Sequence, residues 1–76
     1  MVLAYVLLDV DPVYLQDLIK KLDNLDEIDK IDSVFGEFNM LIQTNMDTQG
    51  SLKNFIQSKI KVLNEVRKSS VLLTRV

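Results

Sequence analysis

Segments with a strand-like pattern and segments with a helix-like pattern alternate along this 76-residue chain, and this alternation constrains the fold more than any other feature. The strand-like segments, rich in β-branched and apolar residues, are Val2 to Val10, Glu27 to Val34, Glu37 to Met46 and Ser69 to Val76. The helical segments run from Tyr14 to Leu25 and from near Asp47 to Leu63. The predicted order is therefore βαββαβ in one domain, residues 1–76, with no linker.

Each predicted helix has a recognisable start and one apolar face. Asp11 is a candidate N-cap for the first helix, with Pro12 at the first helical position, and Asp47 is a candidate N-cap for the second. The apolar face of the first helix consists of Leu15, Leu18, Ile19 and Leu22. That of the second helix consists of Leu52, Phe55, Ile56, Ile60 and Leu63. We expect both faces to pack on a sheet.

The element order predicts an α+β, ferredoxin-like fold. Right-handed crossovers through the two helices place both helices on one face of a four-stranded antiparallel sheet. The first strand is apolar on both of its faces, as is the run from Met40 to Ile42, so the second face of the sheet also needs cover. We predict an obligate homodimer in which Leu3, Tyr5 and Leu7 meet the same face of a second chain.

The composition limits the available chemistry. The chain has no cysteine and no histidine, which excludes disulfides, the usual zinc sites and an imidazole base. Its acidic residues lack the spacing of a calcium loop, and its serines would lack a general base. We therefore expect no metal, no cofactor and no catalytic residue, and so a protein that is not an enzyme.

Charge and hydropathy bear on partners and location. The net charge is −2 and the basic residues are scattered, which disfavours direct binding of nucleic acid. The apolar N-terminal stretch is too short to span a bilayer and has neither the positive start nor the cleavage site of a signal peptide. We expect a cytoplasmic protein with no membrane partner.

Gly36 lies between the second and third strand-like segments, flanked by Phe35 and Phe38. This position predicts the tight turn of a β-hairpin with glycine at positive φ, and the two aromatic side chains are expected to pack. Polar residues interrupt the otherwise apolar strand that follows, and they either find buried partners or face solvent near the sheet edge. These residues are Asn39, Gln43 and Thr44.

The hairpin Val34-Phe35-Gly36-Glu37-Phe38-Asn39, the apolar run after it and the segment Val66 to Thr74 resemble the effector-sensing RAM domain of the Lrp/AsnC (feast/famine) transcriptional regulators. The resemblance covers essentially the whole chain. Its most specific motif is aromatic-Gly-x-aromatic-Asp, and here Asn39 stands where the family pattern has Asp. Full regulators also carry an N-terminal helix-turn-helix domain, whereas this chain starts at the first strand, so it resembles a stand-alone RAM domain.

The resemblance implies a dimeric α+β barrel in which two sheets face each other. It further implies rings of dimers, commonly four dimers forming an octamer, with a free amino acid bound in the cleft between neighbouring dimers. The ligand-binding positions that it transfers to this chain are Phe35, Gly36, Glu37, Asn39, Ser69 and Ser70. Gly36 would then permit the turn and also let backbone groups approach a small zwitterion.

The departure at Asn39 has two readings. A neutral amide pairs less strongly than a carboxylate with an α-ammonium group, so Asn39 should weaken or change amino-acid selectivity. Alternatively, Asn39 only connects the hairpin backbone to its neighbour.

The predicted function is a small effector-binding oligomerisation module that modulates transcription of amino-acid metabolism by assembling with full-length Lrp/AsnC regulators. One alternative is a structural or protein-interaction module of the same fold without a ligand. Another is an ACT-like regulatory domain, in which sheets pair side by side. An enzyme of the dimeric α+β barrel class is disfavoured, because the strands place Val, Leu, Ile and Met where such enzymes have polar groups.

Overall fold

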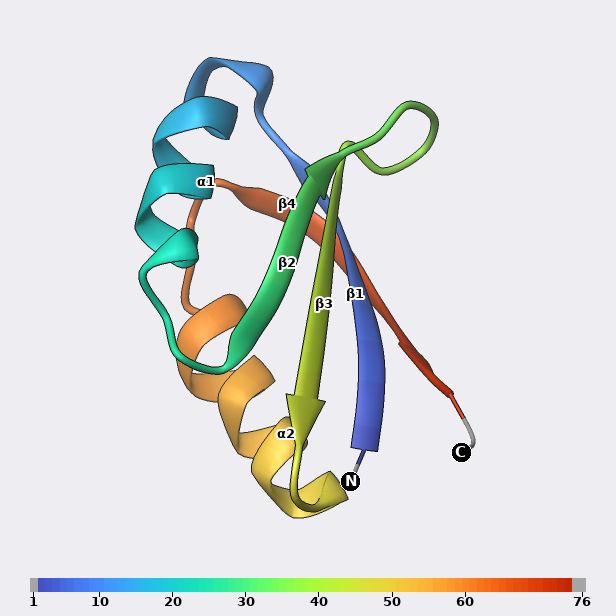
Figure 1. The fold of residues 1–76 in the computed structure, drawn as a ribbon. Helices are drawn as coiled ribbons and strands as arrows, with labels where there is room; N and C mark the ends of the chain where they lie inside the picture. The colour runs from blue at the N-terminus through green and yellow to red at the C-terminus, as the bar shows by residue number, and fades with distance from the viewer. Residues whose placement is uncertain (1, 75–76) are drawn as a thin grey trace.

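The computed structural model describes residues 2–74, which form two layers (Figure 1). In chain order the elements are β1 (Val2–Val10), a 3₁₀ turn η1 (Pro12–Tyr14), α1 (Leu15–Asp23), β2 (Ile28–Ser33), β3 (Met40–Met46), α2 (Gln49–Phe55), a π-helical turn η2 (Ile56–Ile60) and β4 (Val66–Leu73). The strands form one antiparallel sheet in the order β2-β3-β1-β4, and both helices cover the same face of it. The predicted ferredoxin-like βαββαβ fold is confirmed.

The two faces of the sheet are separated by the alternation of side chains along β1. The side chains that face the helices are fully buried: Ala4, Val6, Leu8 and Val10. Leu3, Tyr5 and Leu7 alternate with them and are only partly covered, on the face without helices. We call this second face of the sheet the open face.

The helices complete the core with the apolar faces that the sequence predicts. The buried residues of these faces are Leu18, Leu22, Leu52, Phe55, Ile56, Ile60 and Leu63, and Leu15 and Ile19 pack against them partly buried. Burial of each large aliphatic or aromatic side chain contributes roughly 1.5–3 kcal/mol relative to leaving it exposed. This hydrophobic contact holds the helix layer on the sheet.

One of the two predicted helix starts is confirmed. Asp11 caps the 3₁₀ turn η1, which leads directly into α1: its carboxylate accepts a hydrogen bond from the backbone N–H of Val13 at 3.1 Å, and Pro12 follows it as predicted. The prediction of Asp47 as the second N-cap is wrong. Thr48, directly before α2, has the extended backbone of an N-cap, and its hydroxyl oxygen accepts a hydrogen bond from the backbone N–H of Ser51 at 3.0 Å.

The turn η2 departs from the α-helical pattern at the end of α2. The backbone N–H of Lys61 donates to the carbonyl of Ile56 at 2.8 Å. This acceptor lies five positions before the donor, whereas in an α-helix it lies four positions before. Ile56 and Ile60, at the two ends of this turn, are both buried. Residues four positions apart share one face of a helix, and both isoleucines belong to the core between the helix layer and the sheet.

Two strand boundaries differ from the prediction. β4 begins at Val66, before the predicted Ser69, because the register pairs Lys68 with Asp9 and so extends the ladder towards the N-terminal end of the strand. The last two residues of the predicted strand, 75 and 76, lie outside the described residues. The predicted third strand also begins too early, as the geometry of the hairpin explains below.

The side chains of Thr44 and Gln43, neighbours in β3, lie on opposite faces of the sheet. Thr44 is fully buried, and its hydroxyl donates to the carbonyl of Glu27, just before β2. Gln43 lies opposite Tyr5 in the register, on the open face, and is partly buried. The buried hydroxyl thus has the partner that burial requires.

Candidate functional site

The loop between β2 and β3 projects from one end of the sheet (Figure 1). Ser33 lies opposite Met40 in the register, so six residues, 34–39, connect the paired strands. The predicted hairpin is present, but the predicted tight turn at Gly36 and the predicted start of the third strand at Glu37 are both wrong, because the pairing of the two strands ends at Ser33 and Met40. The result is a wider loop, residues 34–39, which we call the hairpin loop.

The tip of the hairpin loop is open to solvent. Gly36 has φ +124°, which confirms the predicted positive φ, and a Cβ added there would meet nothing within 4 Å. Phe35 is fully exposed, so the expectation that it packs is wrong: the loop carries it away from the sheet. Phe38 is partly buried. An exposed aromatic and an accessible backbone therefore sit side by side.

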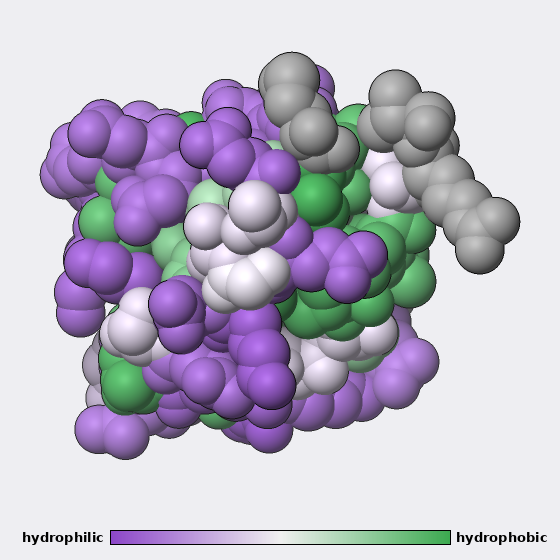
Figure 2. Space-filling view, turned by 90° about the horizontal axis from the view of Figure 1, so that it is seen from below, coloured by the Kyte–Doolittle hydropathy of each residue, from purple (hydrophilic) through white to green (hydrophobic). Residues whose placement is uncertain are grey.

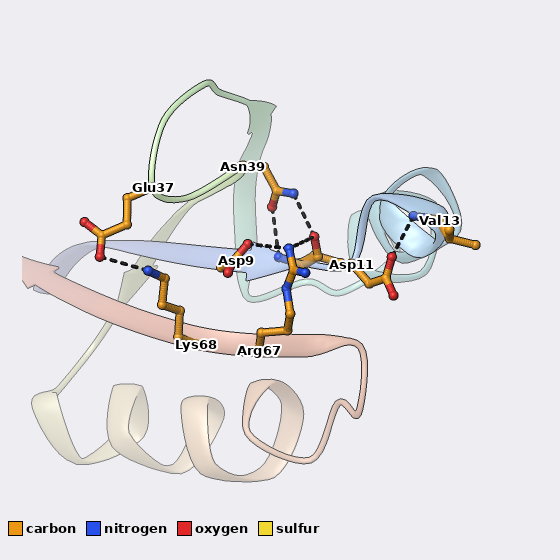
Figure 3. A network of polar contacts seen from close by, with 8 residues as sticks. Asp9, Asp11, Val13, Glu37, Asn39, Arg67 and Lys68 are labelled. Carbon is orange, nitrogen blue, oxygen red and sulfur yellow. Dashed lines mark hydrogen bonds and ion pairs between the residues drawn. The ribbon is translucent and has the colours of Figure 1, made fainter.

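Asn39 holds the base of the loop against β1 (Figure 3). Its side-chain Oδ1 accepts from the N–H of Val10 at 2.9 Å, and its Nδ2 donates to the carbonyl of Val10 at 2.7 Å. Its backbone N–H donates to the carbonyl of Leu8 at 3.0 Å. The amide therefore pairs with Val10 as a neighbouring strand residue would. An ionised carboxylate has no donor for the second of these bonds.

Two ion pairs surround this contact (Figure 3). The Nζ of Lys68 lies 2.9 Å from a carboxylate oxygen of Glu37 and 5.3 Å from the centroid of the Phe38 ring, a cation–π distance. The guanidinium of Arg67 lies 3.0 Å from the carboxylate of Asp9 and 3.5 Å from the carbonyl of Val10. The start of β4, the end of β1 and the hairpin loop thus meet at one corner of the sheet.

The two serines predicted for the site lie on opposite faces of β4. Ser70 pairs with Leu7 and shares the open face with Lys68, two residues before it. Ser69 pairs with Leu8 and lines a hollow of about 200 Å³ beside η2, on the helix side. The structure therefore brings Ser70, but not the side chain of Ser69, to the face on which Lys68 meets the hairpin loop.

Sequence reasoning missed the basic partners of the site. Arg67 and Lys68 were not among the predicted site residues, although Lys68 contacts Glu37 of the loop and Arg67 contacts the carbonyl of Val10 and the carboxylate of Asp9. The only sequence signal for them is a pair of adjacent basic residues in a strand, and Lys68 is 31 positions from Glu37. Pairs so distant in sequence come together only through the register of the sheet.

A larger groove lies elsewhere, between the helix layer and the edge strand β4. Its volume is about 520 Å³, and apolar residues of both layers line it together with polar residues of the helix layer, among them Lys53, Gln57 and Lys61. Leu52 and Ile56 form one wall, and Val71 and Leu73 form the other. No residue of the hairpin loop borders it. The groove and the loop are therefore separate features.

The open face carries exposed apolar surface at its centre. Tyr5 lies beside Leu72 and Leu7 beside Leu41 in the register, and half of Leu72 is exposed. In Figure 2 hydrophobic surface gathers on the right, the side turned away from the helix layer. Contiguous apolar surface on a folded chain marks an interaction site.

Within residues 2–74 no helix has the length and hydropathy needed to cross a membrane. The same part of the chain contains no group of three or more acidic side chains placed to hold a metal ion.

Comparison with known proteins places the chain among small regulatory domains. The model of the Lrp/AsnC ligand binding domain family matches residues 3–74. The crystal structure of FFRP-DM1 superposes with a TM-score of 0.94 at 25% identity, over 99% of this chain and 100% of that one. The hypothetical protein PHS023 from Pyrococcus horikoshii gives 0.93 at 25% identity, over 100% and 92% of the two chains.

A more distant similarity involves a complex with an amino acid. The transcriptional regulator NMB0573 from Neisseria meningitidis, solved with L-Met, has a TM-score of 0.89 at 12% identity, over 99% of this chain and 50% of that one. No curated protein sequence matches the chain.

The family match spans nearly the whole chain, and the fold superposes on that of FFRP-DM1 over almost its full length. The domains of this family are regulatory and generally non-enzymatic. The chain therefore belongs to the Lrp/AsnC ligand-binding domain family.

Proposed function

We propose that this protein is an amino-acid-responsive oligomerisation module, which acts in the cytoplasm by assembling with full-length Lrp/AsnC regulators and so modulates transcription of amino-acid metabolism. The observation that carries the proposal is that the hairpin loop is fixed at its base and accessible at its tip. Gly36 leaves the backbone accessible at its tip, and Asn39 fixes its base to Val10. A loop that is ordered before binding loses less conformational entropy when a small ligand binds.

The proposed ligand contacts are the loop residues Phe35, Gly36 and Glu37 together with Ser70. Asn39 serves in this proposal as support, because Val10 already occupies its amide. Ser69 faces the helix side, so no side-chain contact is assigned to it. A free amino acid is the proposed class of effector, and the L-Met complex of NMB0573, a protein with the same fold, supports that class.

The proposed assembly begins with a homodimer formed through the open face. Leu3, Tyr5 and Leu7 lie at the centre of this face, and Leu41 and Leu72 flank them in the register. Packing of two such faces buries the exposed apolar surface and closes the dimeric barrel. Rings of dimers, up to an octamer, would then bring hairpin loops of neighbouring dimers together.

The first test is the mass of the protein in solution, measured by light scattering after size exclusion with and without a pool of the twenty amino acids. A dimer or larger ring whose mass changes with the pool supports the proposal. A monomer under both conditions contradicts the role of the open face. Calorimetric titration with each amino acid follows, and no heat at millimolar concentration would remove the effector while leaving the assembly.

A second candidate is a structural module without a ligand. It is favoured by one observation: the Asn39 amide uses both its donor and its acceptor within the chain. A constant oligomer mass across all amino acids, together with no heat of binding, would select this function.

A further inference from the structure

The two ion pairs at the corner of the sheet are held differently. The side chain of Asp9 is 21% exposed, and its partner Arg67 also reaches the backbone of Val10. The side chains of Lys68 and Glu37 are 46% and 70% exposed, and neither charged group makes another hydrogen bond or ion pair within the described residues. Exposed pairs contribute only about 0–1 kcal/mol, so the pair of Lys68 and Glu37 opens at little cost.

We propose that Lys68 and Glu37 recognise the two charges of a zwitterionic amino acid, Lys68 pairing with its α-carboxylate and Glu37 with its α-ammonium group. This inference rests on the proposed function and assigns the polarity of the same site. A zwitterion carries one charge of each sign, so it replaces one ion pair within the chain by two ion pairs to the ligand. The net charge of the pair of side chains, zero before binding, is matched by a ligand whose net charge is also zero.

Both side chains are placed for this exchange. The Phe38 ring, 5.3 Å from the ammonium of Lys68, continues to hold that cation after the carboxylate has left it. Glu37 follows Gly36 on the exposed part of the loop, so its carboxylate can turn from Lys68 towards a ligand without steric hindrance. Ser70 lies on the same face as Lys68 and supplies a hydroxyl beside the ligand carboxylate.

The exchange has a consequence for the loop. The Glu37–Lys68 contact is a direct link between the loop and β4, whereas Asn39 links the loop to β1. Binding therefore replaces this direct link between the loop and β4 by a link through the ligand, while the base of the loop stays fixed. Because a neighbouring dimer would meet this tip in the proposed ring, the charge of the ligand controls the assembly at this point.

The test uses calorimetry on the full chain with each of the twenty amino acids, followed by the amide and the N-acetyl derivative of the tightest binder. The amide lacks the carboxylate and the N-acetyl derivative lacks the ammonium group. We expect the wild type to bind each derivative up to about fivefold more weakly, since the loss of an exposed charged contact of up to about 1 kcal/mol corresponds to that factor. Lys68→Gln should bind the amino acid and its amide equally well but still prefer the amino acid to its N-acetyl derivative. Glu37→Gln should show the reverse: no preference over the N-acetyl derivative, and an unchanged preference over the amide.

Two further variants distinguish charge recognition from a change in folding. Lys68→Arg should retain the preference over the amide, and Lys59→Gln, which removes an exposed charge on η2, should leave both preferences unchanged. Circular dichroism of each variant reports whether it is folded. If the wild type binds but Lys68→Gln keeps its full preference over the amide, the inference is wrong and the proposed function stands. If no amino acid binds, both fail.

Discussion

Replacement of Asn39 by Asp tests whether the amide is required as a donor to Val10. The substitution keeps the shape of the side chain and the acceptor for the N–H of Val10, but it removes the donor that lies 2.7 Å from the carbonyl. A net hydrogen bond contributes about 0.5–1.5 kcal/mol, and a carboxylate oxygen held against a carbonyl adds to the loss. Arg67, 3.5 Å from that carbonyl, offsets a part of it. We expect Asn39→Asp to lower the free energy of unfolding by about 1–2 kcal/mol at pH 7.

The pH dependence of this variant follows from the same geometry. The new carboxyl can donate to Val10 only when protonated, so folding raises its pKa above the unfolded value of about 3.9. A group with a raised folded-state pKa contributes stability below its unfolded pKa and loses it as the pH rises through the folded pKa. The difference between Asn39→Asp and the wild type should therefore shrink as the pH falls towards about 4.

Urea unfolding followed by circular dichroism at pH 7 and pH 4 measures both effects, at equal protomer concentrations. With a slope of about 1 kcal/mol per molar urea, the expected loss moves the midpoint by about 1–2 M at pH 7. Asn64→Asp is the matched control, since Asn64 is exposed and makes none of the side-chain hydrogen bonds found in residues 2–74. If Asn39→Asp is no less stable than this control at pH 7, the donor role of the amide is refuted.

Three further substitutions test the fold and the assembly. Leu7→Asp should convert the proposed dimer to monomers without loss of the helical and strand signals, as light scattering and circular dichroism would report; an intact dimer would count against the open face. Gly36→Ala should cost about 1–2 kcal/mol in urea unfolding from backbone strain alone, because the added Cβ has open space, and an unchanged midpoint would contradict this. Thr44→Val leaves the carbonyl of Glu27 without its donor and should cost about 1–3 kcal/mol by the same measurement, whereas a neutral effect would show that the hydrogen bond contributes little.

Local patterns in the sequence predicted the fold well because they report what each segment buries. The alternation in β1 identified which residues face the helices, and the apolar face from Leu52 to Leu63 is buried as expected. The cap of the second helix was missed because Asp47 and Thr48 are both good caps, and only the backbone conformation selects the second. Composition cannot distinguish two adjacent capping residues.

The candidate site was less predictable because its contacts are long-range. Asn39 is 29 positions from Val10, and Glu37 is 31 from Lys68. The loop motif located Gly36 and its positive φ correctly, since that depends on local backbone geometry. The motif left open whether the Asn39 amide pairs within the chain, and it could not indicate that Phe35 points into solvent, because both depend on how the loop lies against β1.

The π-helical turn η2 changes how the end of α2 should respond to the loss of a single codon. A turn of this width holds one residue more than an α-helical turn, so the removal of one residue can be absorbed there. Deletion of Ser58, an exposed residue within the turn, would restore an ordinary α-helical hydrogen bond and leave Ile60 close to its place in the core. Deletion of Asn54, an exposed residue of α2, would instead rotate everything after it by about 100°. In-frame deletions should therefore be better tolerated within η2 than in the regular turns before it.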